Sequence, residues 1–539
     1  MIRNIKNMGI YRLIAVLFVL SILALEGISY GQIGPQAHYY KALEYASQGR
    51  FIAAQKEFKR ISRSSSLYAP ARGSLKVIND VINNNTKGTV AIHILKGIAA
   101  ENKTLRSEVI DKLDRAMETN WSIAATYNSR GAAYEEDGKH ELAFLFYSKA
   151  LRANLMYYAA FNNRGLLYYR SGQYASAVSD FSEAIAVNSE YAEAFNNRGM
   201  AYARTGRHTQ ALSDFSEAIR INSEYAEAYN NRGVAYSHTG EESEALSDYS
   251  TAIMLNPSYA EAYNNRGVAY ARIGKDRKAL SDYSKAIKLN PRYAEAYRNR
   301  GGVYLKGSRY SHVISDYSKV VELSPDVGEA YYNRGFAYYH KGSYDLALSD
   351  YTRAIEINPE HAEAYNQRGL AHYKLDDYDK AIKNYSKAIE IKPDFAEAYT
   401  NRGNTHLKWR HYELAVSDYS EVIDLKPASS EAYNDRGLAH FLKNHLFFNG
   451  MGESHFYVTA TGRKRKVSIN KKMYVKAIAD YTMSIEVDPR NALAHDMIGF
   501  INLMAFGDQD KGCAILKKAC KLGRCKNYRL AKWWYWYCL

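Results

Sequence analysis

The sequence predicts an all-α protein made of stacked helix–turn–helix repeats. A tripeptide Asn-Arg-Gly, or a close variant of it, recurs so that its arginine returns every 34 residues. Seven of the nine prolines stand at one place in the same frame, and apolar residues follow helical spacing in two segments of each interval. A period of this length is typical of a repeat array, so it overrides the three or four globular domains that the length of 539 residues would suggest. The arginines are Arg130, Arg164, Arg198, Arg232, Arg266, Arg300, Arg334, Arg368, Arg402 and Arg436.

Residues 260–293 illustrate one repeat, and positions are counted from Ala260 as position 1. Apolar or aromatic groups at positions 4, 8 and 11 predict a stripe on a first helix, and those at positions 20, 24 and 27 predict a stripe on a second. We expect Gly274 to separate the two helices and Pro291 to end the second. One such pair cannot bury its apolar face alone, so neighbouring repeats must stack.

The repeat resembles the tetratricopeptide repeat at its packing positions, which hold Tyr263, Gly267, Tyr270, Ala279, Tyr283, Ala286 and Pro291. The resemblance covers residues 121–444 and 473–522, and it departs from the family at position 7, where arginine replaces the usual leucine. It implies an α-solenoid, a right-handed superhelix whose concave groove is lined by the first helix of each repeat. It also implies binding of peptides or proteins, without enzymatic activity of its own.

The remaining segments flank or interrupt the regular array, which we expect at residues 121–443. Residues 1–31 are interpreted as a signal peptide and residues 37–120 as degenerate helical repeats. Residues 444–472 form a basic insertion within the tenth regular repeat, and residues 473–539 hold the last repeat helices and a cysteine-bearing aromatic cap. An aromatic end would cover the open apolar face of a terminal repeat.

The N-terminus has the layout of an export signal. Basic residues without acidic ones come first, the apolar run Leu13–Leu25 follows, and the small residues Ser29 and Gly31 precede a cleavage site before Gln32. The apolar run is shorter than the ~20 residues that cross a bilayer as a helix. We therefore expect an exported protein, periplasmic or secreted, with an uncleaved N-terminal anchor as the alternative.

The insertion and the C-terminal end carry most of the net charge of +15, because residues 437–539 hold 17 basic and 7 acidic residues. The alternation in residues 455–469 predicts a short β-hairpin with a basic cluster near its tip. This cluster is either a solvated loop or a contact for an anionic partner, such as an envelope surface or an acidic protein. Nucleic acid is not an expected partner of an exported protein. The cluster consists of Arg463, Lys464, Arg465 and Lys466.

All four cysteines lie near the C-terminus, at Cys513, Cys520, Cys525 and Cys538. Cys513 and Cys520 would be ~10 Å apart on one helix, too far for a disulfide. A bond between Cys520 and Cys525, or between Cys525 and Cys538, is easier to form. The spacing fits no common zinc site, so no metal is expected.

An acidic residue follows most position-7 arginines after 16 residues, as in Arg198 and Asp214, Arg232 and Asp248, and Arg266 and Asp282. An arginine on an apolar stripe needs a partner. We interpret the pairs as structural links within a repeat or between adjacent repeats, which specify packing more than they stabilise it. The alternative is a row of arginines that faces an anionic ligand.

Asparagines repeat on the helix face that carries positions 2, 5, 6 and 9, opposite the buried stripe. By the resemblance this face is concave. An amide offers both a donor and an acceptor, so the row is predicted to clamp the backbone of an extended peptide. The alternative is that these side chains cap neighbouring helices or face solvent. They are Asn163, Asn197, Asn231, Asn265, Asn299, Asn333 and Asn401 at position 6, and Asn162, Asn196, Asn230 and Asn264 at position 5.

No sequence motif for a nucleophile, a phosphate-binding loop or a dinucleotide site is present, so no catalytic residue, cofactor or small-molecule substrate is expected. The predicted function is an exported scaffold that binds extended segments of other proteins in its groove. The alternative is a module that docks on an anionic envelope surface through its basic insertion and aromatic tail.

Overall fold

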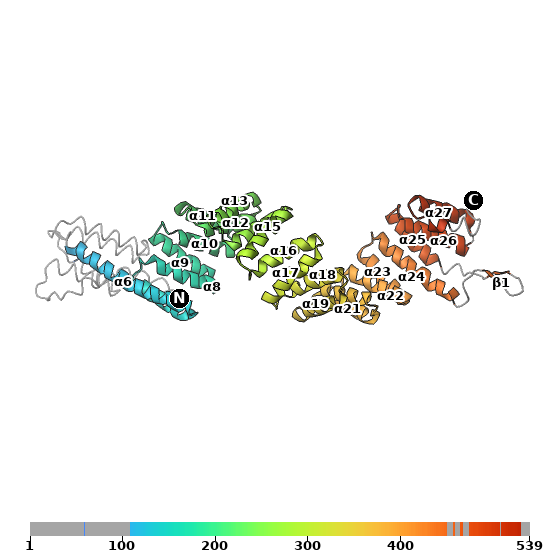
Figure 1. Cartoon of the computed structure of the whole chain (residues 1–539), viewed down its shortest axis with the longest axis horizontal. Helices are drawn as coiled ribbons and strands as arrows, with labels where there is room; N and C mark the ends of the chain where they lie inside the picture. Colours follow the sequence, from blue (N-terminus) through green and yellow to red (C-terminus); the bar gives the residue numbers. More distant parts are fainter. Residues whose placement is uncertain are drawn as a thin grey trace. The chain divides into compact units, whose positions relative to one another are not determined.

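The computed structural model describes residues 108–449, 456–458, 464–466, 474–506 and 508–529, together with residue 59. The chain forms two compact units, Met1–Lys275 and Asp276–Leu539, and each is described by itself. In both units consecutive helices pack as pairs joined by short turns (Figure 1). The predicted all-helical repeat architecture is therefore confirmed.

In the first unit, each second helix of a pair also packs on the first helix of the next pair, which continues the stack. The helices are α6 (Glu108–Glu136), α7 (His140–Ala153), α8 (Tyr158–Arg170), α9 (Tyr174–Val187), α10 (Ala192–Arg204), α11 (His208–Ile221), α12 (Ala226–Thr239), α13 (Glu242–Leu255) and α14 (Ala260–Arg272).

The second unit repeats this arrangement and adds two short strands. Its helices are α15 (Asp276–Leu289), α16 (Ala294–Lys306), α17 (Tyr310–Leu323), α18 (Gly328–His340), α19 (Tyr344–Ile357), α20 (Ala362–Lys374), α21 (Tyr378–Ile391), α22 (Ala396–Lys408), α23 (Tyr412–Leu425), α24 (Ser430–Asn449), α25 (Val475–Val487), α26 (Ala492–Ile501), the π-helix η2 (Asn502–Phe506) and α27 (Gln509–Lys521). The strands β1 (Phe456–Val458) and β2 (Lys464–Lys466) pair antiparallel.

The core of a repeat combines small residues on its first helix with one large ring from its second. In the repeat of α10 and α11, Ala194 and Ala201 are fully buried, and the ring of Phe215 at position 24 is buried against Ala235 of the next repeat. A Cβ atom on Gly199 at position 8 would lie only 2.7 Å from that ring, so the close approach of the two helices requires glycine. Sequence analysis identified positions 8 and 24 but missed the buried alanines at positions 3 and 10.

The turn between the two helices of a repeat needs a left-handed residue at position 15. Glycine supplies it without steric cost in most repeats, for example Gly274 with φ of 72°. Three repeats place another residue type there: Ser308, Asp376 and Arg410, with φ of 53°, 58° and 65°. The separating role predicted for Gly274 is confirmed, and the three exceptions lie in the second unit.

Two predicted boundaries differ from the structure. The helix α6 is continuous from Glu108, so no break occurs at residue 121, and α24 extends to Asn449 rather than ending before residue 444. A hairpin forms in the insertion, and Lys464, Arg465 and Lys466 make up its second strand. Lys464 pairs with Val458, the last residue of the first strand, so the basic cluster lies near the tip, as predicted.

The predicted signal peptide, most of residues 37–120 and the aromatic end lie outside the described residues. Among the helices that the structure describes, none combines the length and the apolar character needed to cross a membrane.

Candidate functional site

Most position-7 arginines are held against the second helix of their own repeat. The Nε and Nη2 atoms of Arg198 donate to the two carboxylate oxygens of Asp214, both at 2.8 Å. Arg232 binds Asp248 with the same geometry at 2.8 and 2.9 Å. Such a bidentate pair fixes the orientation of both side chains. The structure thus places these two predicted pairs in contact inside the repeat. The carboxylate of the third predicted pair, Asp282, belongs to the second unit and is buried.

A second contact of the arginine was missed by sequence analysis. The free Nη1 atom donates to a serine hydroxyl at position 25 of the preceding repeat, as Arg198 does to Ser182 at 3.1 Å and Arg266 to Ser250 at 3.2 Å. One guanidinium therefore links three helices, two from its own repeat and one from the repeat before it. The recurring serine at position 25 was the signal available in the sequence.

Half-buried tyrosines cover the faces of these guanidinium groups. The Cζ atom of Arg232 lies 5.6 Å from the ring centre of Tyr229 and 5.9 Å from that of Tyr236. These rings occupy positions 4 and 11, which were predicted to be part of the buried stripe. They are only half-buried because they pack on the arginine as cation–π partners, and the fully enclosed ring is the one at position 24.

The repeat of Arg368 has a hydrogen bond in place of the charge pair. Nε of Arg368 donates to Oδ1 of Asn384 at 2.8 Å, where other repeats have aspartate. Burial lowers the pKa of Arg368, since the neutral amide gives its charge no compensation. The hydrogen bond alone preserves the helix packing, which indicates that the geometry of the contact matters more to the fold than its charge.

The asparagines of the first unit bind one another between repeats. The Nδ2 atom at position 6 donates to Oδ1 at position 5 of the preceding repeat, from Asn197 to Asn162 at 2.9 Å and from Asn231 to Asn196 at 3.0 Å. Asn163 and Asn265 bind Asn128 and Asn230 in the same way, both at 3.0 Å. The position-5 residues Asn162, Asn196, Asn230 and Asn264 are buried. We call this row the amide ladder.

Burial changes what each asparagine can contribute. The predicted clamp included both positions, but the position-5 amides are enclosed between repeats; Nδ2 of Asn162 donates to Glu193 at 3.0 Å. They orient the position-6 side chains and offer little surface to a ligand. Asn163, Asn231 and Asn265 are half-buried. Their Nδ2 atoms are bonded within the ladder, and their Oδ1 atoms have no hydrogen bond to any described residue. The ladder therefore leaves a row of acceptor oxygens.

The ladder is interrupted in the second unit. Nδ2 of Asn401 donates to Oδ1 of Asn366 at 2.9 Å. Asn333 instead donates to the hydroxyl of Tyr317 at 3.3 Å, because position 5 of the preceding repeat is Arg298 and has no amide oxygen. Asn299, on α16, is half-buried in the same unit.

A pocket of about 510 Å³ opens among the first helices of the second unit. It is lined mainly from α18, α20, α22 and α24, at positions 9, 12 and 13 of the repeat, with Tyr385 from α21 and Tyr412 from α23. Asn401 contributes its unbonded Oδ1 atom, and Asn404 contributes Nδ2 because its Oδ1 accepts from Tyr419 at 2.8 Å. The lining also holds Tyr339, Tyr373, Tyr385, Tyr412, Leu370, Leu407, Leu442, Lys374, Lys408 and Arg410.

The C-terminal repeat is closed by covalent and polar contacts. Cys520 and Cys525 form a disulfide, one of the two pairings predicted to be easier, and Cys513 is also disulfide-bonded. Buried Asp496 accepts from Arg524 at 3.0 Å and from Asn527 at 2.8 Å. These contacts fold the chain after α27 back on α26, so they cover the last repeat.

Comparison with known proteins identifies the repeat. Models of the tetratricopeptide repeat match residues 162–226, 260–293, 328–361, 362–395 and 396–429, and a TPR repeat model matches residues 239–274. No curated protein matches the chain.

Solved structures with likeness to the chain include three repeat proteins. YrrB, described as a TPR protein with an unusual peptide-binding site, is 29% identical over 34% of this chain and 95% of its own, with a TM-score of 0.33. MamA from Desulfovibrio magneticus is 24% identical over 32% and 96%, with a TM-score of 0.30. Yeast Tom70 is 15% identical over 76% and 93%, with a TM-score of 0.32.

The family models match segments whose helix pairs, buried glycine and enclosed ring are those of the structure. Repeats of this kind serve as scaffolds for protein–protein interaction. The matched segments, residues 162–226, 239–293 and 328–429, are thus tetratricopeptide repeats.

Proposed function

We propose that the chain is an exported scaffold that binds extended segments of partner proteins along the first helices of its repeats. The observation that carries this proposal is the amide ladder. Each bond of the ladder occupies Nδ2 of a position-6 asparagine and leaves its Oδ1 atom as an acceptor. A row of acceptors suits the backbone N–H groups of an extended chain, since a peptide presents them whatever its side chains are.

Two matched variants test the clamp. Alanine at position 6 removes the acceptor, whereas alanine at position 5 removes the ladder bond and keeps the acceptor. We expect proximity capture of partner proteins from the native envelope to fall with the first variant and to persist with the second. Equal loss in both would show that the asparagines act only through stability, which thermal unfolding of both variants would measure. The variants are Asn163/Asn231/Asn401→Ala and Asn162/Asn230/Asn366→Ala.

Export rests on the first 31 residues. We expect the mature protein to begin at Gln32, and N-terminal sequencing of the protein from cells checks this. A chain that keeps Met1 and fractionates with the membrane would support the uncleaved anchor instead.

A second candidate function is docking on an anionic envelope surface. It is favoured by the strand β2, in which Lys464, Arg465 and Lys466 are consecutive. Docking through these cations should weaken steeply as ionic strength rises, while binding by amide acceptors should change little. Sedimentation with phosphatidylglycerol vesicles, with and without residues 444–472, separates the two functions.

A further inference from the structure

Position 13 lies in the last turn of the first helix and is basic in successive repeats. It holds Arg170, Arg204, His238, Arg272, Lys306, His340, Lys374 and Lys408. In both units the described contacts of this position are made mainly with position 12 or 17 of the preceding repeat. Position 17 or position 12 of the preceding repeat therefore supplies the partner of the positive charge, as Glu135 at position 12 does for Arg170.

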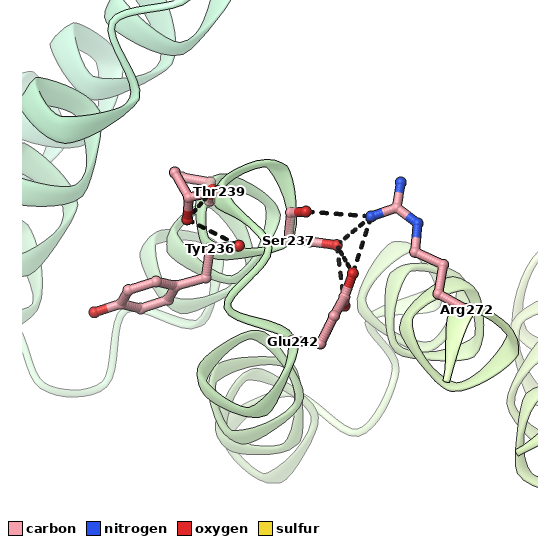
Figure 2. Close-up of polar contacts among 6 residues, drawn as sticks. Tyr236, Ser237, Thr239, Glu242 and Arg272 are labelled. Atoms are coloured by element: carbon pink, nitrogen blue, oxygen red, sulfur yellow. Dashed lines mark hydrogen bonds and ion pairs between the residues drawn. The ribbon is translucent and has the colours of Figure 1, made fainter. Parts of the chain in front are cut away.

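Where position 17 is acidic, the cation is neutralised. Arg272 donates Nη1 to the hydroxyl of Ser237 at 2.6 Å and to Glu242 at 3.1 Å (Figure 2). Lys306 pairs with Asp276 at 3.1 Å. Where position 17 is aromatic and position 13 is histidine, the rings stack instead, as His238 does on His208 with centres 5.3 Å apart.

The two lysines of the next repeats have no such partner. Position 17 of the preceding repeat is Tyr344 for Lys374 and Tyr378 for Lys408. Neither lysine, nor Arg410 in the following turn, makes an ion pair, a hydrogen bond through its side chain or a ring contact with any residue that the structure describes.

Two acidic residues of the adjoining segments pair with other lysines, and a third accepts a hydrogen bond from a neutral hydroxyl. Asp376 accepts from the hydroxyl of Tyr378 at 2.5 Å, Asp377 pairs with Lys380 at 2.8 Å, and Glu413 pairs with Lys443 at 2.9 Å. Lys374, Lys408 and Arg410 all line the pocket, and no acidic residue of the described part of the chain lines it, so the lining is positively charged.

Other side chains of the pocket can contact an aromatic or apolar group and the backbone of a peptide. Tyr339 and Tyr373 provide rings. Asn401 offers an acceptor and Asn404 a donor, which together match one peptide unit. The pocket thus combines cations, rings and a complementary amide pair.

We propose that this pocket recognises an acidic peptide segment in which aspartate or glutamate flanks an aromatic or large apolar residue. The proposal rests on the proposed function and names the class of its partner. The carboxylates pair with Lys374, Lys408 and Arg410, and the central side chain lies among the tyrosine rings. Asn401 and Asn404 of the pocket hold the peptide backbone without selecting a sequence.

Two matched arrays of short peptides test the proposal with the full mature chain. One array carries Asp or Glu around an aromatic residue, and the other carries Asn or Gln at the same places. We expect the acidic peptides to bind about tenfold more tightly, equivalent to about 1.4 kcal/mol. We also expect Lys374→Gln combined with Lys408→Gln to remove this preference, with fluorescence anisotropy as the readout.

The matched control changes the same repeat position where the cations are already neutralised, Arg272→Gln combined with Lys306→Gln. It should keep the preference for acidic peptides. Equal binding of both arrays, or equal loss in both double variants, overturns the proposal; the groove clamp would still stand if the position-6 alanine variant abolished binding. If neither array binds but phosphatidylglycerol vesicles do so through Lys374 and Lys408, the pocket proposal fails and the clamp loses its support as well.

Discussion

The first helices of the two units differ in polar lining while their packing is the same. In the first unit, Asn163, Asn197, Asn231 and Asn265 each bind an asparagine of the preceding repeat at 2.9–3.0 Å. In the second unit, position 6 does not form a continuous row of such bonds, because Asn333 binds a tyrosine and Asp435 replaces asparagine. The bidentate arginine pairs persist in both, for example at Arg198 and Arg334.

The comparison separates two tasks within one repeat. The arginine, the glycine at position 8 and the ring at position 24 hold the helices together, so they recur in both units. Positions 5, 6, 13 and 15 lie outside that framework and can change without altering the fold. The second unit uses this freedom, and one of its exceptions at position 15, Arg410, lines the pocket.

The largest expected effect is the loss of a framework pair. Asp214→Ala leaves the guanidinium of Arg198, whose side chain is 19% exposed, without its carboxylate. Removing one partner of such an enclosed pair destabilises by about 3 kcal/mol, because an uncompensated charge stays in the interior. Hydrogen exchange of α10 and α11, with urea unfolding of the chain, measures the change.

The control for this prediction is Asp276→Ala, which removes the partner of Lys306 at the surface. Its side chain is 37% exposed and that of the lysine 66%, so the loss should stay below about 1 kcal/mol. If both variants cost the same, the arginine pairs are no more important to the framework than surface ion pairs.

The framework could be predicted from sequence because its signals lie within single repeats. A fixed interval of 16 residues joins arginine to aspartate, and the two helices that carry them are neighbours in every repeat. Because this spacing recurs in most repeats, it predicts that the arginine and aspartate side chains are in contact. The disulfide between Cys520 and Cys525 was predictable for the same reason, since both residues belong to one local segment.

The lining of the candidate site depends on contacts between repeats, which no single repeat reveals. The face shared by positions 5 and 6 was predicted, but the stacking of neighbours buries Asn162 and leaves Asn163 half-buried. Lys306 and Lys374 are the same residue type at the same position. Only the residue 30 places earlier, Asp276 or Tyr344, distinguishes them, and sequence analysis did not make that comparison.

A change in stability of intermediate size is expected at Asp435, which occupies position 6 in place of asparagine. Burial, with a smaller contribution from Glu431, raises the pKa of Asp435 from 3.8 to about 6. A raised carboxyl pKa in the folded state means that stability is complete below pH 4 and is lost as pH rises through 6. Asp435→Asn should therefore stabilise the second unit at pH 7 by about 1–3 kcal/mol, and this gain should vanish near pH 4.

Thermal unfolding of the two proteins at several pH values checks this difference. His406 titrates in a similar range, because burial lowers its pKa to about 4, but its contribution is present in both proteins and cancels. A gain that stays constant from pH 4 to pH 7 would contradict the assignment, since it would reflect an amide contact and not the lost carboxylate.

The smallest effect on the fold should accompany a large effect on binding. Arg410 occupies the left-handed position 15, with φ of 65°, where most repeats have glycine. Arg410→Gly should raise the stability of the second unit by about 1 kcal/mol by removing that steric cost. It should also weaken the binding of acidic peptides, because one of the three pocket cations is lost. Ser308→Gly, at the same position in a repeat outside the pocket, should give the same stabilisation without a change in peptide binding.

A higher melting temperature together with a lower affinity, seen for Arg410→Gly alone, would show that the second unit keeps a strained residue for its ligand. A gain in stability with unchanged affinity would place Arg410 outside the site.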